Sequence, residues 1–142
     1  MLRNNQSIRF FILLLVCLAT IHAQDYVAVL EFDGSGMSKI EARNITERFS
    51  FELQQTRKFI LIERQALEQI IGEQKVQLSG CVADECAVEV GKLAGARYVI
   101  AGSVTKTFGL YGIAVRLIDV ESGEIVTHIL ESDEADVQKF VS

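Results

Sequence analysis

The sequence contains no proline and no tryptophan, and its 142 residues include only two histidines and three cysteines. The absence of proline argues against a proline-rich linker and so against several domains joined by one. Two histidines argue against a metal site with several imidazole ligands. Basic residues are also few: 14 Lys and Arg stand against 19 Asp and Glu, for a net charge of −5. This balance argues against nucleic-acid binding, which requires a basic patch.

Long apolar runs are equally scarce, and the longest stands near the N-terminus. Residues 1–9 are polar with two arginines and no acid, residues 10–20 are apolar, and the small residue Ala23 follows. This layout is typical of a secretory signal peptide cleaved after Ala23. The alternative is a membrane anchor, but a run of about 11 residues is shorter than the roughly 20 that a spanning helix needs. We predict a signal peptide at 1–23, one domain at 24–142 and no transmembrane helix in the mature chain.

Cys17 lies inside this apolar run and raises the question of lipidation. A lipoprotein signal favours a small residue directly before the modified cysteine, whereas Val16 stands there. We interpret Cys17 as one of the hydrophobic residues of the signal, and lipid attachment stays open as the alternative. The signal peptide predicts export.

The mature chain contains two cysteines, Cys81 and Cys86. An exported protein commonly joins such a pair in a disulfide. Because five residues along a helix rise about 7.5 Å, which is too far for a disulfide, Cys81 should lie in the loop before a helix and Cys86 in its first turn. One alternative is a redox pair, and another is half of a zinc site, for which only His128 supplies an imidazole in the mature chain. No metal and no cofactor are predicted.

Apolar periodicity predicts helices between two early strands and a later group of strands. Residues 26–32 and 59–62 are apolar and rich in β-formers, which indicates buried strands. Ser38 and Glu41 have the spacing of a capping box at the start of a helix. The apolar face of that helix consists of Ala42, Ile45, Phe49 and Leu53.

Two more helices and three consecutive strands complete the predicted domain. One helix is expected at 63–74, and another runs from an N-cap at Asp84 to a stop near Gly95. Strands follow at 98–105, 113–120 and 125–130, joined by a tip at 106–112 and a tight turn in which Gly123 suits a left-handed backbone. The order β-α-β-α-α-β-β-β predicts an α/β (α+β) domain, with a mixed sheet and helices packed on it.

Two short segments are candidates for binding. Gly34, Ser35 and Gly36 follow the first strand and precede a helix, which is half of a phosphate-loop pattern. Because the match is incomplete, a plain strand-to-helix turn is the favoured interpretation. Phe108, Leu110 and Tyr111 form an apolar cluster at the predicted tip. Exposed apolar tips commonly contact a partner, and the alternative is that the tip folds back onto the sheet. We also expect an open sheet edge to take part in contacts.

Several segments together resemble the bacterial curli production assembly/transport component family (CsgG/HfaB-like). The similarity covers most of the predicted domain and rests on the order and spacing of its segments. They are VAVLEF at 27–32, FILIER at 59–64, LEQII at 67–71, LSGC at 78–81, CAVEVGKL at 86–93, AGSV at 101–104 and RLIDVESGE at 116–124.

This resemblance implies a domain similar to the N-terminal domain of the Tol-system β-propeller protein. It implies a location in the periplasm of a Gram-negative-type bacterium, with association to the outer membrane left open. It also implies non-enzymatic work in envelope assembly or secretion, carried out by contact with other envelope proteins or by self-association. Peripheral membrane association is compatible with this reading. The alternatives are a module that binds a small ligand or activates a cell-wall synthase, and a thiol–disulfide enzyme that uses Cys81 and Cys86. No Gly-x-Ser-x-Gly elbow is present to support a serine hydrolase.

Overall fold

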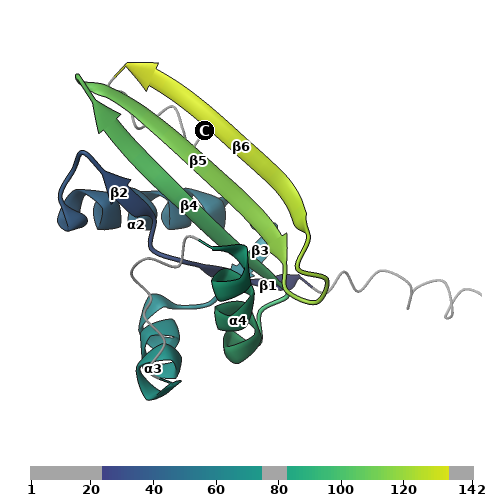
Figure 1. Ribbon diagram of the computed structural model, residues 1–142. Helices are drawn as coiled ribbons and strands as arrows, with labels where there is room; N and C mark the ends of the chain where they lie inside the picture. Colours follow the sequence, from purple (N-terminus) through teal and green to yellow (C-terminus); the bar gives the residue numbers. More distant parts are fainter. Residues whose placement is uncertain (1–23, 75–82, 135–142) are drawn as a thin grey trace, which may run out of the picture.

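The computed structural model describes residues 24–74 and 83–134, and Figure 1 shows their arrangement. Within these residues, one sheet and three helices confirm the predicted mixed α+β class. The predicted signal peptide, including Cys17, lies outside the described residues. The elements in chain order are β1 (Asp25–Val29), β2 (Asp33–Ser35), α2 (Lys39–Gln55), β3 (Phe59–Leu61), α3 (Arg64–Gln74), α4 (Asp84–Ala94), β4 (Tyr98–Thr107), β5 (Leu110–Asp119) and β6 (Ile125–Glu134).

The six strands form one mixed sheet in the order β3-β1-β4-β5-β6, and β2 also pairs with β4. Strands β3, β1, β2 and β4 pair in parallel, and β4, β5 and β6 form the predicted antiparallel meander. The apolar run at 26–32 predicted one strand, followed by a turn at 33–36. Instead β1 ends at Val29, and the chain returns to the sheet at Asp33 as β2.

Two hydrophobic cores lie on opposite faces of the sheet (Figure 1). On one face α2 packs through the predicted residues Ile45, Phe49 and Leu53 against strand residues such as Ile100 and Val115. On the other face α3 and α4 pack against the sheet. Their cluster contains Ala28, Leu30, Leu67, Ile71, Ala87, Val90, Ala96, Val99, Ala101, Ile118 and Val120.

Helix ends follow the predicted signals at two places and depart from them at one. The Ser38 hydroxyl accepts a hydrogen bond from the Glu41 amide, and the Ser38 amide donates to the Glu41 carboxylate, which confirms the capping box. Gly95 ends α4 in the left-handed conformation, as expected. The predicted N-cap at Asp84 is wrong by one residue, because Ala83 occupies that position. Asp84 lies in the first helical turn, and its Oδ1 is 2.6 Å from Arg116 Nη1 on β5.

The β4–β5 connection is shorter than the sequence suggested. A longer tip was expected at 106–112, but Thr107 pairs directly with Leu110, so only Phe108 and Gly109 form the turn. Both have positive φ, 51° and 82°, which is the signature of a type I′ hairpin turn. In the β5–β6 turn Gly123 has φ 74°, as predicted.

Candidate interaction surface

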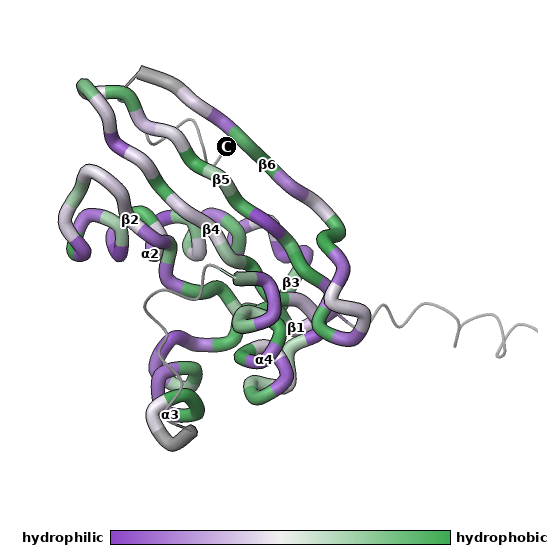
Figure 2. Tube along the Cα trace, viewed as in Figure 1, coloured by the Kyte–Doolittle hydropathy of each residue, from purple (hydrophilic) through white to green (hydrophobic). Residues whose placement is uncertain are grey.

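The β4–β6 meander extends past the helices, and its outermost strand is exposed. Every side chain described in β6, from Ile125 to Ser132, is exposed to solvent. Four of these side chains are large and hydrophobic, and Leu130 keeps 74% of its surface exposed. Figure 2 shows hydrophobic stretches along β6, the strand farthest from β1 in the sheet. The exposed hydrophobic side chains of β6 are those of Ile125, Val126, Ile129 and Leu130.

Strand pairing distributes the β6 side chains over both faces of the sheet. Leu130 lies opposite Ala114, and Ile129 lies opposite the core residue Val115. Since paired residues share a face and neighbours alternate, Leu130 is on the α4 side and Ile129 is on the α2 side. Among the described residues no strand pairs with the outer edge of β6. Within the described part of the chain, the strand therefore offers exposed apolar side chains on both faces and an unpaired backbone edge.

The predicted tip residues occupy different environments. Phe108 is fully exposed at the turn, and Leu110 beside it is about half exposed. Tyr111 is half-buried in β5 opposite Lys106 and packs against the α2-side core, so the alternative of folding back applies to this residue alone. Phe108 and Leu110 thus both lie at the exposed end of the hairpin, whereas Tyr111 packs against the α2-side core.

Charged groups tie the base of the hairpin to α2. The Nζ of Lys106 lies 5.2 Å from the Tyr111 ring centroid and 3.2 Å from Glu41 Oε1. The hydrogen bond with Tyr111, followed by the contact with Glu41, raises the pKa of Lys106. Hydrogen bonds from Ser38, followed by Lys106, lower the pKa of Glu41 from 4.5 to about 2. The same carboxylate therefore caps α2 and anchors the hairpin.

The predicted anion-binding segment forms part of the sheet. Gly34 and Ser35 in β2 pair with Val104 and Thr105 of β4. A Cβ at Gly36 would lie 2.1 Å from the carbonyl oxygen of Lys106, so this glycine allows the segment after β2 to approach β4 closely. The next helix N-terminus is capped by the Glu41 carboxylate of the chain itself. These contacts give all three residues a structural explanation.

The remaining candidate residues are the two cysteines and His128, and not all of them lie in the described part of the chain. Cys86 lies in the first turn of α4 and packs against the core, as the spacing predicted. Cys81 lies outside the described residues, so the disulfide stays a prediction. His128 is exposed on β6 opposite Arg116. Within residues 24–74 and 83–134, no group of three His, Cys, Asp or Glu could hold a metal ion, and no helix is long and apolar enough to cross a membrane.

The fold and the residue pattern define the class of the protein. The sequence profile of the curli production assembly/transport component CsgG matches residues 21–108, from before β1 to the hairpin turn. The chain therefore belongs to the CsgG family, which confirms the resemblance found in the sequence. No protein of curated function matches the chain.

Solved structures share the fold at low sequence identity. The LpoB C-terminal domain from Salmonella enterica has a TM-score of 0.67 at 18% identity, covering 87% of this chain and 92% of that one. A PelC dodecamer subunit from Paraburkholderia phytofirmans has a TM-score of 0.52 at 17% identity, with coverage of 83% and 81%. TolB from Acinetobacter baumannii has a TM-score of 0.53 at 14% identity, covering 80% of this chain and 24% of TolB. The TolB similarity confirms the predicted Tol-like fold.

The β6 side chains at the open edge were not predicted from the sequence as part of a contact surface. Residues 125–130 were recognised as a strand and an open edge was expected, but the two were not connected. Their place in the sequence could have indicated this, because the last strand of a meander commonly forms the edge of the sheet. The fully exposed Phe108 was identified from its apolar neighbours alone.

Proposed function

We propose that the protein is a non-enzymatic periplasmic accessory of envelope assembly or secretion that acts by protein–protein contact. Membership of the CsgG family and the fold shared with LpoB and PelC support this function. The contact surface is the hairpin end together with β6, defined by Phe108, Leu110, Ile129 and Leu130. Its partner is another envelope protein or a second copy of the chain.

Phe108 is the observation that carries the proposal. A left-handed backbone costs an L-residue roughly 1–2 kcal/mol, and a bulky side chain there is a genuine outlier. Phe108 has φ 51° and is fully exposed, so within the described residues it recovers no core packing. Residues held in such conformations cluster at functional sites. An aromatic side chain raised on a rigid hairpin suits insertion into a pocket of a partner.

The charge around the hairpin end favours a protein partner over an anionic lipid surface. Glu131 lies on β6 opposite Ile113 and is exposed. Its carboxylate would be repelled by anionic headgroups. A basic protein surface with an apolar pocket complements both features.

Site-specific photo-crosslinking tests this function. A crosslinking side chain at position 108 or 130 should capture the same protein in envelope preparations. The matched control is position 40, because Ile40 is also strongly exposed but lies at the start of α2. Phe108→Asn should abolish capture from position 130. Capture equal at positions 40 and 108, or capture of lipid alone, would contradict the proposal.

Activation of a cell-wall synthase is the narrower alternative, and it would use the same surface. The identity of the captured protein separates the two functions: a synthase supports the alternative, and a secretion or assembly component supports the main proposal. Capture of the chain itself indicates self-association. Crosslinked species of defined stoichiometry then report the size of the assembly.

A further inference from the structure

The pairing pattern of the meander shows which backbone groups of β6 point away from the sheet. Thr107 and Leu110 flank the two-residue turn and therefore form a hydrogen-bonded pair. Hydrogen-bonded and non-hydrogen-bonded pairs alternate along antiparallel strands, so Leu110 and every second residue of β5 after it bond to β4. The residues between them, such as Ile113 and Val115, bond to β6 instead. These pairs fix the direction of each backbone group in β6.

On β6, this alternation leaves every second residue with its backbone facing outward. Ile129 lies opposite Val115, so its amide and carbonyl bond to β5. His128, Leu130 and Ser132 direct their amides and carbonyls to the other side, where no strand of the described chain pairs with them. Figure 1 shows β6 as the outer strand of the meander. The outer edge thus offers backbone donors and acceptors at the spacing of a sheet ladder.

The two edges of the sheet are protected to different degrees. Strand β3, at the opposite edge, has three residues and directly follows Lys58. Short edge strands and edge lysines are common devices against the addition of a further strand. Strand β6 has ten residues, contains neither lysine nor proline, and has its register shift between Ile125 and Thr127. From Thr127 onward its edge is therefore regular and lacks these protections.

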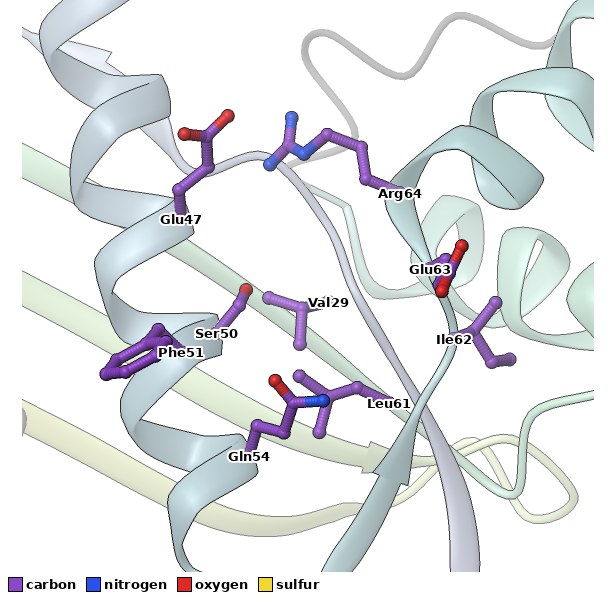
Figure 3. Close-up of a pocket in the computed structure, with 9 residues that line it drawn as sticks. All are labelled: Val29, Glu47, Ser50, Phe51, Gln54, Leu61, Ile62, Glu63 and Arg64. Atoms are coloured by element: carbon purple, nitrogen blue, oxygen red, sulfur yellow. The ribbon is translucent and has the colours of Figure 1, made fainter.

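The cavity between α2 and β3 shows the opposite situation (Figure 3). Its volume is about 440 Å³, and the guanidinium of Arg64 lies between Glu47 and Glu63 in Figure 3. Arg64 Nη1 is 2.9 Å from Glu31 Oε2, and Glu47 Oε1 is 3.5 Å from Arg43 Nε. These charged groups are paired within the chain, whereas the outward groups of β6 are not paired with any described strand.

Charge selects among the strands that could bind to this edge. Glu131 is exposed and bonds to β5, so its pair with an added strand would be a non-hydrogen-bonded one, in which side chains lie closest. A lysine or arginine at that place would form a favourable cross-strand pair. A second copy of β6 has no lysine or arginine to place there. A strand of another protein therefore fits this edge better than a second copy.

We propose that the partner of the contact surface adds an extended strand to the outer edge of β6. The strand belongs to another protein and carries a basic residue opposite Glu131 and apolar residues opposite Leu130 and Ile129. Backbone hydrogen bonds to His128, Leu130 and Ser132 supply affinity, and the side chains supply specificity. This inference rests on the proposed function and specifies how its partner binds.

A blocked hexapeptide, acetyl-Thr-Lys-Val-Ile-Thr-Val-amide, is the probe for strand addition. Bound antiparallel, it places its lysine opposite Glu131 and its first valine opposite Leu130. Titration followed by NMR should show slower hydrogen exchange at the Leu130 amide and no change at the Ile129 amide, which already bonds to β5. The same peptide with glutamate in place of lysine should bind about fivefold more weakly. No binding, or equal binding of both peptides, would overturn the proposal.

A proline substitution tests the backbone bonds directly. Leu130→Pro removes one outward amide and keeps the bonds to β5, because proline is tolerated where its missing N–H faces solvent. It should weaken peptide binding about tenfold, whereas the matched control Leu130→Thr keeps the amide and should weaken it less than about threefold. A peptide N-methylated at the valine opposite Leu130 repeats the test without altering the protein. Unchanged binding of that peptide would contradict strand addition.

The proposed function and the added strand fail in different ways. A crosslinker at position 108 should lose its captured protein in the Leu130→Pro chain and keep it in the Leu130→Thr chain. If capture at position 108 persists in the Leu130→Pro chain, the contact function stands and the added strand is overturned. If the peptide binds but positions 108 and 130 capture no protein, the contact function fails instead. A dimer of the purified protein that the peptide dissociates would assign the edge to a second copy and overturn the choice of partner.

Discussion

Strands β4 and β5 each have a helical half, at Val99–Ala101 and Ile118, and a free half, at Thr107 and Leu110. The two halves belong to the same strands but are stabilised differently. Strand β4 passes from the buried residues Val99–Ala101 to the exposed end at Thr107, and β5 passes from the exposed Leu110 to the fully buried Ile118. Hydrogen-bonded pairing continues through both halves without a break. The burial of side chains between the helices, by contrast, does not extend to the end of the hairpin.

The two halves therefore differ in what stabilises them: side-chain burial in one and backbone pairing in the other. In the helical half, apolar side chains on both faces are removed from water, and this burial supplies most of the stability. In the free half, backbone pairing and a tight turn hold the strands while apolar side chains remain accessible. Contact surfaces are commonly drawn from such less stabilised regions. The following predictions test that division.

The largest expected effect comes from removing core volume in the helical half. Ile118→Ala deletes part of a fully buried side chain and should lower the free energy of unfolding by about 2–5 kcal/mol. Leu130→Ala in β6 should change it by less than about 0.5 kcal/mol, because Leu130 is mostly exposed. Urea denaturation of both variants measures the contrast. Similar losses would show that β6 is covered in solution.

Two glycines provide the next test. A Cβ at Gly91 of α4 would lie 2.6 Å from Val120 Cγ2, so Gly91→Ala should destabilise the protein by about 1–3 kcal/mol. A Cβ at Gly112 of β5 would meet nothing within 4 Å. Gly112→Ala should be neutral or stabilise slightly, because alanine loses less entropy on folding. Thermal denaturation of the two variants, compared at equal concentration, measures the difference.

The hairpin turn should respond in the opposite direction to the core. Phe108→Asn places Asn-Gly in a turn that prefers it and should stabilise the protein by about 1 kcal/mol while abolishing partner contact. Phe108→Ala is the control for side-chain loss, because its Cβ keeps the unfavourable left-handed conformation. A melting temperature that falls in both variants would show that Phe108 has a stabilising role.

Acid should produce the smallest effect, and its sign follows from Glu41. The folded pKa of Glu41 is about 2, below its ordinary value of 4.5, so the unfolded chain binds more protons between these values. The stability that Glu41 contributes is fully present above pH 4.5 and is lost as the pH falls toward 2. Glu41→Gln should flatten this dependence. The measurement is the urea midpoint of both proteins from pH 2.5 to 6. If Glu41→Gln leaves the loss of stability in acid unchanged, other carboxylates are responsible for that loss. Asp119 is one candidate, because the Ser122 amide is the chief cause of its lowered pKa.

Much of the fold could be predicted because its signals are local. The Ser38–Glu41 capping box and Gly95 mark helix ends within one turn of sequence. The break between β1 and β2 could not be predicted. Leu30 and Phe32 are both buried, in the two different cores, so hydropathy continues through a segment where pairing with β4 shifts by one residue.

The candidate site was only partly predictable for a related reason. Residues 125–130 resemble any buried strand, and their exposure depends on helices that pack elsewhere in the fold. The left-handed backbone at Phe108 is set by the pairing of Thr107 with Leu110, because no local preference of phenylalanine favours it. The cavity between α2 and β3 depends on chain topology, which no single motif encodes.

The two-residue turn at Phe108 also has a consequence for the order of folding. The β4–β5 hairpin needs only local closure, which takes microseconds, whereas the parallel pairing of Val27 with Tyr98 must bring distant parts of the chain together. We therefore expect amide protection during refolding to appear at Thr107 and Leu110 before it appears at Val27; the reverse order would contradict this. The part of the native protein that is least covered would then be the first to form, and the helices would close around one end of a hairpin that already exists.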